Sequence, residues 1–216
     1  AALDISGSMN SYYRNGVMSE FVGKLLPFGI QFDDNEEIDM WAFDHGFREL
    51  PSATAAVYDD YVGNCMRGIS ISGGTAYAPV MDDIYNSYFG KTRRDNVVHT
   101  QEERAKGGFF GKLLGKKETV TVSTTHTTYE DPENMMPAMV LFQTDGENSD
   151  DGYVRSLLSR HINTPVFWLM VGVGDSSFRS LRGLANDFPN VDFIPVESLD
   201  MSDEKLYDEL LKGKFK

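Results

Sequence analysis

The sequence predicts an α/β fold in three layers, a doubly wound, mostly parallel sheet with helices on both of its faces. Two continuous apolar runs, 138–143 and 166–172, are typical of strands that are buried on both faces of a parallel sheet. Segments with helical periodicity separate the candidate strands, and strands that alternate with helices imply a parallel sheet. The length of 216 residues suits one such domain, or one domain with an insertion.

The expected elements follow one another along the chain. We interpret residues 1–3 as the end of a strand that is truncated at the N-terminus. Apolar residues recur every three or four positions after it, which predicts a helix with one apolar face, through Tyr13, Val17, Phe21, Leu25 and Phe28. We further expect strands at 37–43, 47–50, 138–143, 166–172 and 191–195, and helices at 58–66, 77–89, 151–161, 177–188 and 203–212. Sheets of this kind bind ligands beyond the carboxyl ends of their strands, so a site is expected there.

A basic, glycine-containing stretch interrupts this alternation. Residues 91–117 hold eight Lys and Arg against three Asp and Glu, whereas the whole chain has a formal net charge of −13. Alternating β-branched residues follow at 119–128 and predict an exposed strand or hairpin arm. We therefore interpret 91–137 as an insertion into a domain that spans 1–216.

The middle of this insertion permits two interpretations. Residues 106–117 interleave Phe109, Phe110, Leu113 and Leu114 with lysines. Such a segment could make a peripheral contact with an anionic membrane or dock an acidic partner, because its cations are attracted to negative surfaces. The alternative is a surface loop whose apolar side chains pack on the flank of the domain itself.

The composition excludes several classes of protein. A net charge of −13 argues against a nucleic-acid binder, which needs basic surface to neutralise phosphates. Cys65 is the one cysteine, so a disulfide framework is excluded. No apolar run approaches the ~20 residues of a membrane-spanning helix. We expect a cytoplasmic globular protein, associated with membranes at most through 106–117, and the sequence leaves its oligomeric state open.

Three loops rich in oxygen ligands stand at expected junctions between strands and helices. The segments are 4–10 after the opening strand, 72–77 before a helix, and 143–148 after an apolar run. Carboxylates and hydroxyls are hard ligands of the kind that Mg²⁺ prefers. Because hydroxyls add no charge, the ion would stay electrophilic and favour a carboxylate from a partner.

Simpler interpretations than a metal site exist for the residues in and near these loops. Ser and Asp at such junctions often act only as helix caps, because they satisfy free backbone N–H groups. The nearby acidic residues Glu147, Asp150 and Asp151 are interpreted as a solvated acidic rim rather than as further ligands. The ordered set of three loops favours the metal site over capping alone.

The motif Asp4-Ile-Ser6-Gly-Ser8 resembles the DxSxS signature that opens the metal-ion-dependent adhesion site of von Willebrand factor type A (vWA) domains. Thr75 after a Gly-Gly pair and Asp145 in Thr-Asp-Gly resemble the later parts of the same site. The resemblance implies that Ser6, Ser8 and Thr75 contact a metal ion directly, and that Asp4 and Asp145 do so directly or through water. It implies Mg²⁺, with Mn²⁺ or Ca²⁺ as alternatives.

Longer segments narrow the resemblance. Residues 25–34, 73–80, 142–150 and 165–168 are similar to the vWA domains of bacterial tellurium-resistance proteins of the TerF-like group. This similarity implies a bacterial, cytoplasmic, stress-related setting, in which the domain assembles a complex rather than catalyses a reaction.

Three functions compete on this basis. The first is an interaction module that holds Mg²⁺ and binds an acidic residue of a protein partner. The second is a hydrolase that uses the same ion on a phosphoester, and the third is a structural domain with an empty site. A hydrolase needs a general base and a clamp for the charge of its substrate. The three loops contain neither His nor Arg, so we favour the interaction module, with no catalytic residues.

Overall fold

The computed structural model describes residues 1–30, 36–57, 60–90, 92–105, 117–130, 136–146, 148–174, 176–196 and 202–211, with the backbone alone for 28, 92–105, 117–130, 209 and 211. The chain forms two compact units. The first, here called the main domain, comprises Ala1–Tyr88 and Met136–Lys216. The second, here called the ribbon unit, comprises Phe89–Met135.

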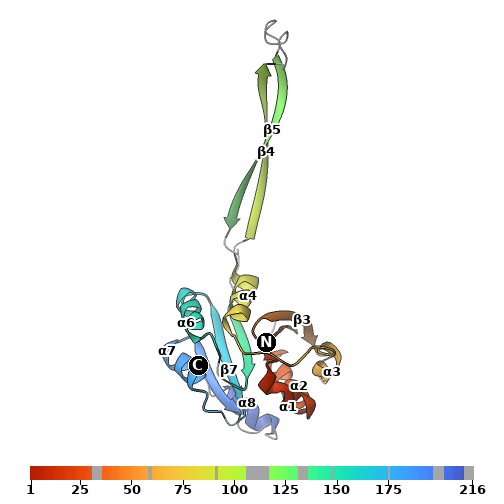
Figure 1. Cartoon of the computed structure of the whole chain (residues 1–216), viewed down its shortest axis with the longest axis vertical. Coiled ribbons are helices and arrows are strands. Elements are labelled where there is room, and N and C mark those ends of the chain that lie inside the picture. The colour runs from red at the N-terminus through yellow and green to blue at the C-terminus, as the bar shows by residue number, and fades with distance from the viewer. Residues whose placement is uncertain are drawn as a thin grey trace. The chain divides into compact units, whose positions relative to one another are not determined.

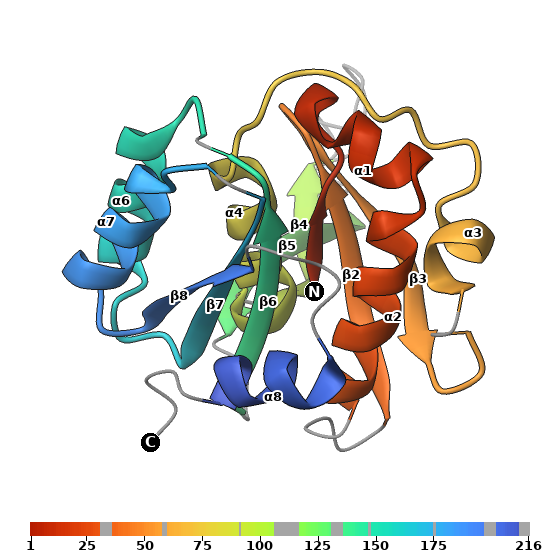
Figure 2. The same ribbon diagram turned by 90° about the horizontal axis from the view of Figure 1, so that it is seen from below.

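The main domain is built on a six-stranded sheet with the strand order β3-β2-β1-β6-β7-β8. Its strands are β1 (Ala2–Asp4), β2 (Glu37–Phe43), β3 (Phe47–Thr54), β6 (Ala138–Thr144), β7 (Val166–Val173) and β8 (Val191–Val196). All neighbours are parallel except β2 and β3. The predicted fold class, a mostly parallel α/β sheet, is confirmed (Figure 2).

Helices cover both faces of this sheet. They are the 3₁₀ helix η1 (Gly7–Met9) and the α-helices α1 (Asn10–Arg14), α2 (Val17–Ile30), α3 (Tyr61–Cys65), α4 (Ala78–Phe89), α6 (Asp151–Arg160), α7 (Arg179–Asp187) and α8 (Asp203–Leu211). Figure 2 shows α2 and α8 on the near face and α4 on the far face. The near face is mostly aliphatic, and its buried cluster includes Leu3, Leu25, Leu141 and Leu206.

Aromatic side chains fill the far face. The rings of Phe43 and Tyr77 lie 4.6 and 5.0 Å from that of Phe142, and Tyr85 packs edge-on against Trp168 at 5.4 Å. The indole N–H of Trp168 also donates to the hydroxyl of Tyr85 at 2.9 Å. This packing holds α4, and with it the loop that precedes α4, against the ends of β2 and β6.

Two elements differ from the sequence prediction in an instructive way. The helix expected through Tyr13 and Phe28 is broken into α1 and α2 at Gly16, whose φ of +77° is a left-handed conformation that glycine adopts without strain. The short strand expected at 47–50 continues to Thr54 through Pro51. Pro51 is tolerated because β3 is an edge strand, where an N–H of the ladder can be missing.

The ribbon unit contains a two-stranded antiparallel sheet of β4 (Thr92–Ala105) and β5 (Lys117–Glu130). The strand predicted at 119–128 is thus present as β5, and its partner β4 was not predicted. Residues 106–116, on which most of the membrane-contact prediction rests, lie outside the described residues. Among the described residues, no helix is long and apolar enough to cross a membrane.

Candidate metal centre

The three predicted loops meet where the order of the strands reverses. β1 lies between β2 and β6, so the chain winds from β1 to one side first and later to the other. Asp4 and Thr144 are the last residues of β1 and β6, whose pairing places Leu3 beside Gln143. Such a reversal leaves a crevice at the carboxyl ends of the two strands. The fold therefore places the predicted residues at the expected position of a ligand site.

The carboxylate of Asp4 is the buried centre of this site. Its Oδ1 accepts the backbone N–H of Ser6 at 2.8 Å, and its Oδ2 accepts the hydroxyl of Thr144 at 2.6 Å. Burial raises the pKa of Asp4 to about 6, partly opposed by the hydrogen bonds from Ser6 and Thr144, and the charge of Asp145 raises it further. Water therefore solvates the ionised carboxylate of Asp4 poorly, and a nearby cation would stabilise its charge.

A chain of hydrogen bonds leads from this centre to the surface. The hydroxyls of Ser6 and Ser8 lie 3.1 Å apart, and that of Ser8 donates to Oδ1 of Asp145 at 3.0 Å. Burial also raises the pKa of Asp145. Asp4 and Ser6 are buried, Asp145 is half-buried and Ser8 is exposed. Four of the five predicted ligands are therefore linked in one network that opens to solvent at Ser8.

The hydroxyl of Ser6 does not act as a helix cap. Ser6 stands at the N-cap position of η1, but its side chain makes no capping hydrogen bond there. Its hydroxyl faces that of Ser8 instead. Helix capping therefore does not account for this serine.

Hydrogen bonds to its backbone position Thr75, the fifth predicted ligand. Its carbonyl oxygen accepts both the backbone N–H and the hydroxyl of Ser149 at 2.8 Å. The same loop is tied to the first one, because Gly7 N–H donates to the carbonyl of Gly73 at 3.0 Å and Ser72 N–H donates to that of Ile5 at 2.9 Å. Within the described part of the chain, the Thr75 hydroxyl shares no hydrogen bond with the other four predicted ligands.

Sequence reasoning missed the residues that hold the loops together. Asp150 accepts the backbone N–H groups of Tyr77 and Ala78 at 3.0 and 2.8 Å, so it caps the start of α4 from the loop after β6. The hydroxyl of Tyr77 donates to the carbonyl of Gly146 at 2.7 Å and approaches that of Thr144 at 3.2 Å. Because the start of α4 lies far from Asp150 in the sequence, no local pattern indicates this cap.

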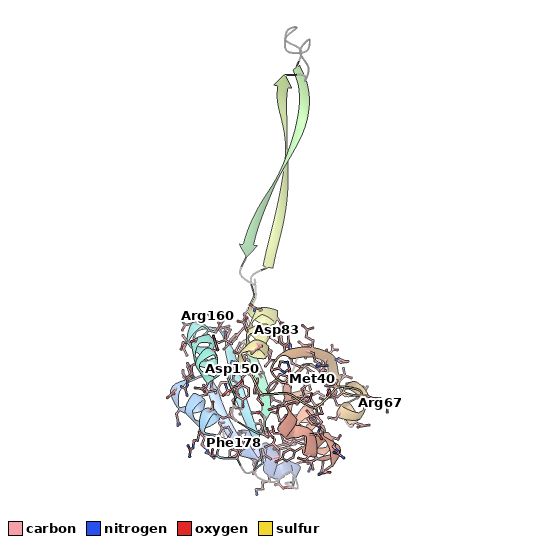
Figure 3. The ribbon with its side chains drawn as sticks, in the orientation of Figure 1. Met40, Arg67, Asp83, Asp150, Arg160 and Phe178 are labelled. Atoms are coloured by element: carbon pink, nitrogen blue, oxygen red, sulfur yellow. The ribbon has the colours of Figure 1, made fainter. Side chains whose placement is uncertain are left out.

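Of the residues predicted to form a solvated acidic rim, Asp150 is engaged within the fold, whereas the side chain of Asp151 is 41% exposed. Asp150, labelled in Figure 3, is half-buried and engaged as described. Asp151 pairs with Arg155 at 2.7 Å and accepts the hydroxyl of Ser180 at 2.6 Å. Glu147 lies outside the described residues.

A histidine that the sequence did not connect with the site lies beside its second loop. Nδ1 of His45 stands 3.3 Å from Oδ1 of Asp44, in the turn between β2 and β3. A Cβ atom at Gly73 would stand 2.9 Å from this nitrogen. The contact depends on the pairing of β2 with β1, which no local pattern around His45 reveals.

The donor set fits a hard divalent cation. Two carboxylates and two serine hydroxyls converge through hydrogen bonds, and oxygen ligands of this kind suit Mg²⁺ or Ca²⁺. Among the described residues, no three His, Cys, Asp or Glu side chains gather into a potential metal cluster. An ion held here would therefore depend on the hydroxyl groups as well as on Asp4 and Asp145.

Gly73 permits a first test of this geometry. Its φ is +93°, and a side chain there would meet His45, whereas a Cβ at Gly74 meets nothing within 4 Å. We expect Gly73→Ala to lower the free energy of unfolding by about 1–2 kcal/mol and to weaken Mg²⁺ binding. Gly74→Ala is the matched control and should change neither quantity. Urea unfolding and calorimetric titration measure the two effects, and equal results for both variants would contradict the placement of this loop.

Comparisons with known proteins agree with this architecture. The chain is 27% identical over 217 residues to the uncharacterized protein YcbR of Bacillus subtilis (strain 168), a match that covers 97% of this chain and 72% of that protein. The solved structure of a von Willebrand factor type A protein from Catenulispora acidiphila superposes with a TM-score of 0.57 at 15% identity. That match covers 96% of this chain, which spans 40% of that protein's length, and it shows the fold. Residues 1–215 match the model of the vWA domain found in the TerF C terminus, and the chain belongs to this vWA-TerF-like family.

Proposed function

We propose that this domain is a metal-dependent protein-interaction module. In it, Asp4, Ser6, Ser8, Thr75 and Asp145 hold a Mg²⁺ ion, which Mn²⁺ or Ca²⁺ can replace, and the ion binds a carboxylate of a protein partner. The observation that carries the proposal is the hydrogen-bonded network from buried Asp4 to exposed Ser8. A network of this kind has one end fixed by the sheet and one end open to a partner.

The charge of the site supports an anionic ligand. Only two of the five proposed ligands are charged, and the neutral hydroxyls donate little electron density, so the ion would stay electrophilic and able to take a further oxygen ligand at an open coordination position. A surface hollow beside Ser8 offers room for the partner, and it is lined by Gly7, Ser8, Asn10, Ser11, Arg14 and Asn15. Arg14 in this hollow would add attraction for an acidic partner.

Membership of the vWA-TerF-like family supports a proposal about the cellular context of the domain. We propose that the domain works in the bacterial cytoplasm, in a complex for tellurium resistance or stress response, with a protein rather than a nucleic acid as partner. A peripheral membrane contact through 106–117 stays a prediction. Co-sedimentation with anionic liposomes, compared with a deletion of 106–117, measures it, and equal binding by both proteins would contradict it.

Capture of partners with and without metal tests the proposed function. The immobilised protein should retain a partner in Mg²⁺ and release it in EDTA, and Thr75→Ala should retain none. Thr75 is a suitable site because its hydroxyl is not part of the network that links the other four ligands. Ser70→Ala, which removes an exposed hydroxyl just before this loop, is the matched control. Capture that persists in EDTA or in Thr75→Ala would contradict the proposal.

One observation favours hydrolysis of a phosphoester as a second candidate. His45, paired with Asp44 beside Gly73, offers an imidazole at the rim of the site. Release of p-nitrophenol from its phosphate ester in Mg²⁺ or Mn²⁺, lost in His45→Ala, would support this candidate. The interaction module predicts no release above the rate of the metal alone.

A further inference from the structure

The ribbon unit presents two long strand edges. In the described part of the unit, β4 pairs with β5 and each strand has a partner on one side only (Figure 1). An isolated two-stranded sheet is marginally stable in water, and a third strand or a packed face normally stabilises it. The outer edges of β4 and β5 are therefore candidate docking surfaces.

Neither edge is interrupted by Pro or by a shift of register, whereas charged residues, which also protect natural edge strands, are present in β4. The register runs without a shift from Thr92 opposite Glu130 to Ala105 opposite Lys117. Neither strand contains Pro or Gly in its sequence. Natural edge strands are usually short or interrupted by Pro or a bulge, because an open edge accepts another strand. The charges of β4 then decide whether such a strand is repelled or attracted.

The charges of β4 are complementary to those of a second copy of β4 that runs antiparallel to it. Arg93 and Arg94 stand near the start of β4, and Glu102 and Glu103 stand near its end. When a second β4 runs antiparallel with Val98 opposite its own copy, Arg93 stands opposite Glu103 and Arg94 opposite Glu102. The two-fold axis repeats both pairs, so each end of the interface has two oppositely charged pairs. Opposite charges directly across a strand pair are stabilising.

The neighbouring registers lack this complementarity. Backbone hydrogen-bonding groups alternate between the two edges of a strand, so an antiparallel register changes in steps that keep the same edge in contact. One step in one direction places Arg94 opposite Arg104 and Asp95 opposite Glu103, which repel. One step in the other direction places Arg94 opposite Thr100 and forms none of these ion pairs. The register centred on Val98 is thus selected by charge.

We infer that β4 pairs edge to edge with β4 of a second copy of this chain, antiparallel and centred on Val98, to form a two-fold symmetric dimer with a four-stranded sheet. The interface is isologous: Arg93 of one copy faces Glu103 of the other, and Glu103 of the first copy faces Arg93 of the second. Main-chain hydrogen bonds provide the affinity and the charges provide the register.

Charge reversal in the full chain tests this inference. Sedimentation velocity over a concentration series should show the wild type in a monomer–dimer equilibrium. The variants Arg93→Glu/Arg94→Glu and Glu102→Arg/Glu103→Arg should each dimerise about tenfold more weakly or worse, because every pair then has like charges. An equimolar mixture of the two should dimerise again, because all four pairs in the heterodimer have opposite charges.

The controls separate this interface from other causes. Arg67→Glu/Arg179→Glu makes the same change of charge as Arg93→Glu/Arg94→Glu, but at exposed positions of the main domain, and should leave dimerisation unchanged (Figure 3 labels Arg67). A monomeric wild type at the highest attainable concentration, dimers of both reversed variants, or a mixture that stays monomeric would each overturn the inference.

A cysteine cross-link gives an independent measurement that does not depend on charge. Directly opposed antiparallel residues have Cα atoms about 4.5–5.5 Å apart, within the range that a disulfide spans. In a Cys65→Ser background, Val98→Cys should form a covalent dimer under mild oxidation. Thr124→Cys, which stands opposite Val98 on β5, should remain monomeric in the same background. Equal cross-linking at both positions would contradict the β4 interface.

Discussion

Replacement of Asp145 by Asn is expected to abolish the stabilisation of the protein by Mg²⁺. The wild type should gain about 2.7 kcal/mol in free energy of unfolding when free Mg²⁺ is about 100-fold above its Kd, because the ion binds the folded state alone. The variant keeps an oxygen that can accept the hydroxyl of Ser8, but it loses one of the two charges that hold the ion. Its unfolding should therefore be independent of Mg²⁺.

Thermal unfolding in Mg²⁺ and in EDTA, at matched ionic strength, measures this effect. Asp208→Asn, which changes an exposed carboxylate on α8, is the matched control and should respond to Mg²⁺ like the wild type. A wild type with no shift of Tm, or an Asp145→Asn variant with the full shift, would refute the metal centre. Either result would leave the inferred dimer untouched, since the ribbon contributes no ligand.

Replacement of Asp4 by Asn is expected to stabilise the metal-free protein while it removes metal binding. The pKa of Asp4 is raised by burial to about 6, above the value of 3.8 for an exposed carboxyl group. Between these two values the folded state retains a proton that the unfolded state has lost. The contribution of Asp4 to the free energy of unfolding therefore falls as the pH rises through this interval, by about 3 kcal/mol in total. Asn does not ionise and avoids this loss.

Urea unfolding from about pH 4 to about pH 8 in EDTA measures the difference. We expect the variant to be more stable than the wild type by about 1–3 kcal/mol at the alkaline end, with the difference vanishing toward the acid end. Mg²⁺ should restore the wild type alone, because a cation offsets the buried charge of Asp4. Parallel pH profiles for the two proteins would show that burial does not raise the pKa of Asp4.

The sequence alone determined the type and order of most elements of the main domain. The runs at 138–143 and 166–172 became β6 and β7 because continuous apolar strands are stable only when both faces are covered. The loops that contain the candidate ligands could be located for a related reason. Asp4 and Asp145 stand directly at strand ends, and the ends of adjacent parallel strands share one edge of the sheet.

Other features depended on contacts that no local pattern encodes. The strand β4 was missed because it is charged and lacks apolar alternation, and it becomes a strand through its pairing with β5. The cap that Asp150 places on α4 joins residues 72 and 73 positions apart in the chain. His45 reaches Gly73 only through the pairing of the central strands.

The difference between the features that the sequence predicted and those that it missed has a physical cause. Periodicity and turn chemistry act over a few neighbouring residues, so the sequence by itself determined the parallel sheet, its helices and the oxygen-rich loops at its strand ends. The resemblance to vWA domains then singled out Asp4, Ser6, Ser8, Thr75 and Asp145 in these loops. The tertiary structure decided how buried each of these oxygens is, which of them share hydrogen bonds, and which strands of the ribbon pair with each other. These properties arise from neighbours that are distant in the chain, because burial and electrostatic interaction depend on distance in space.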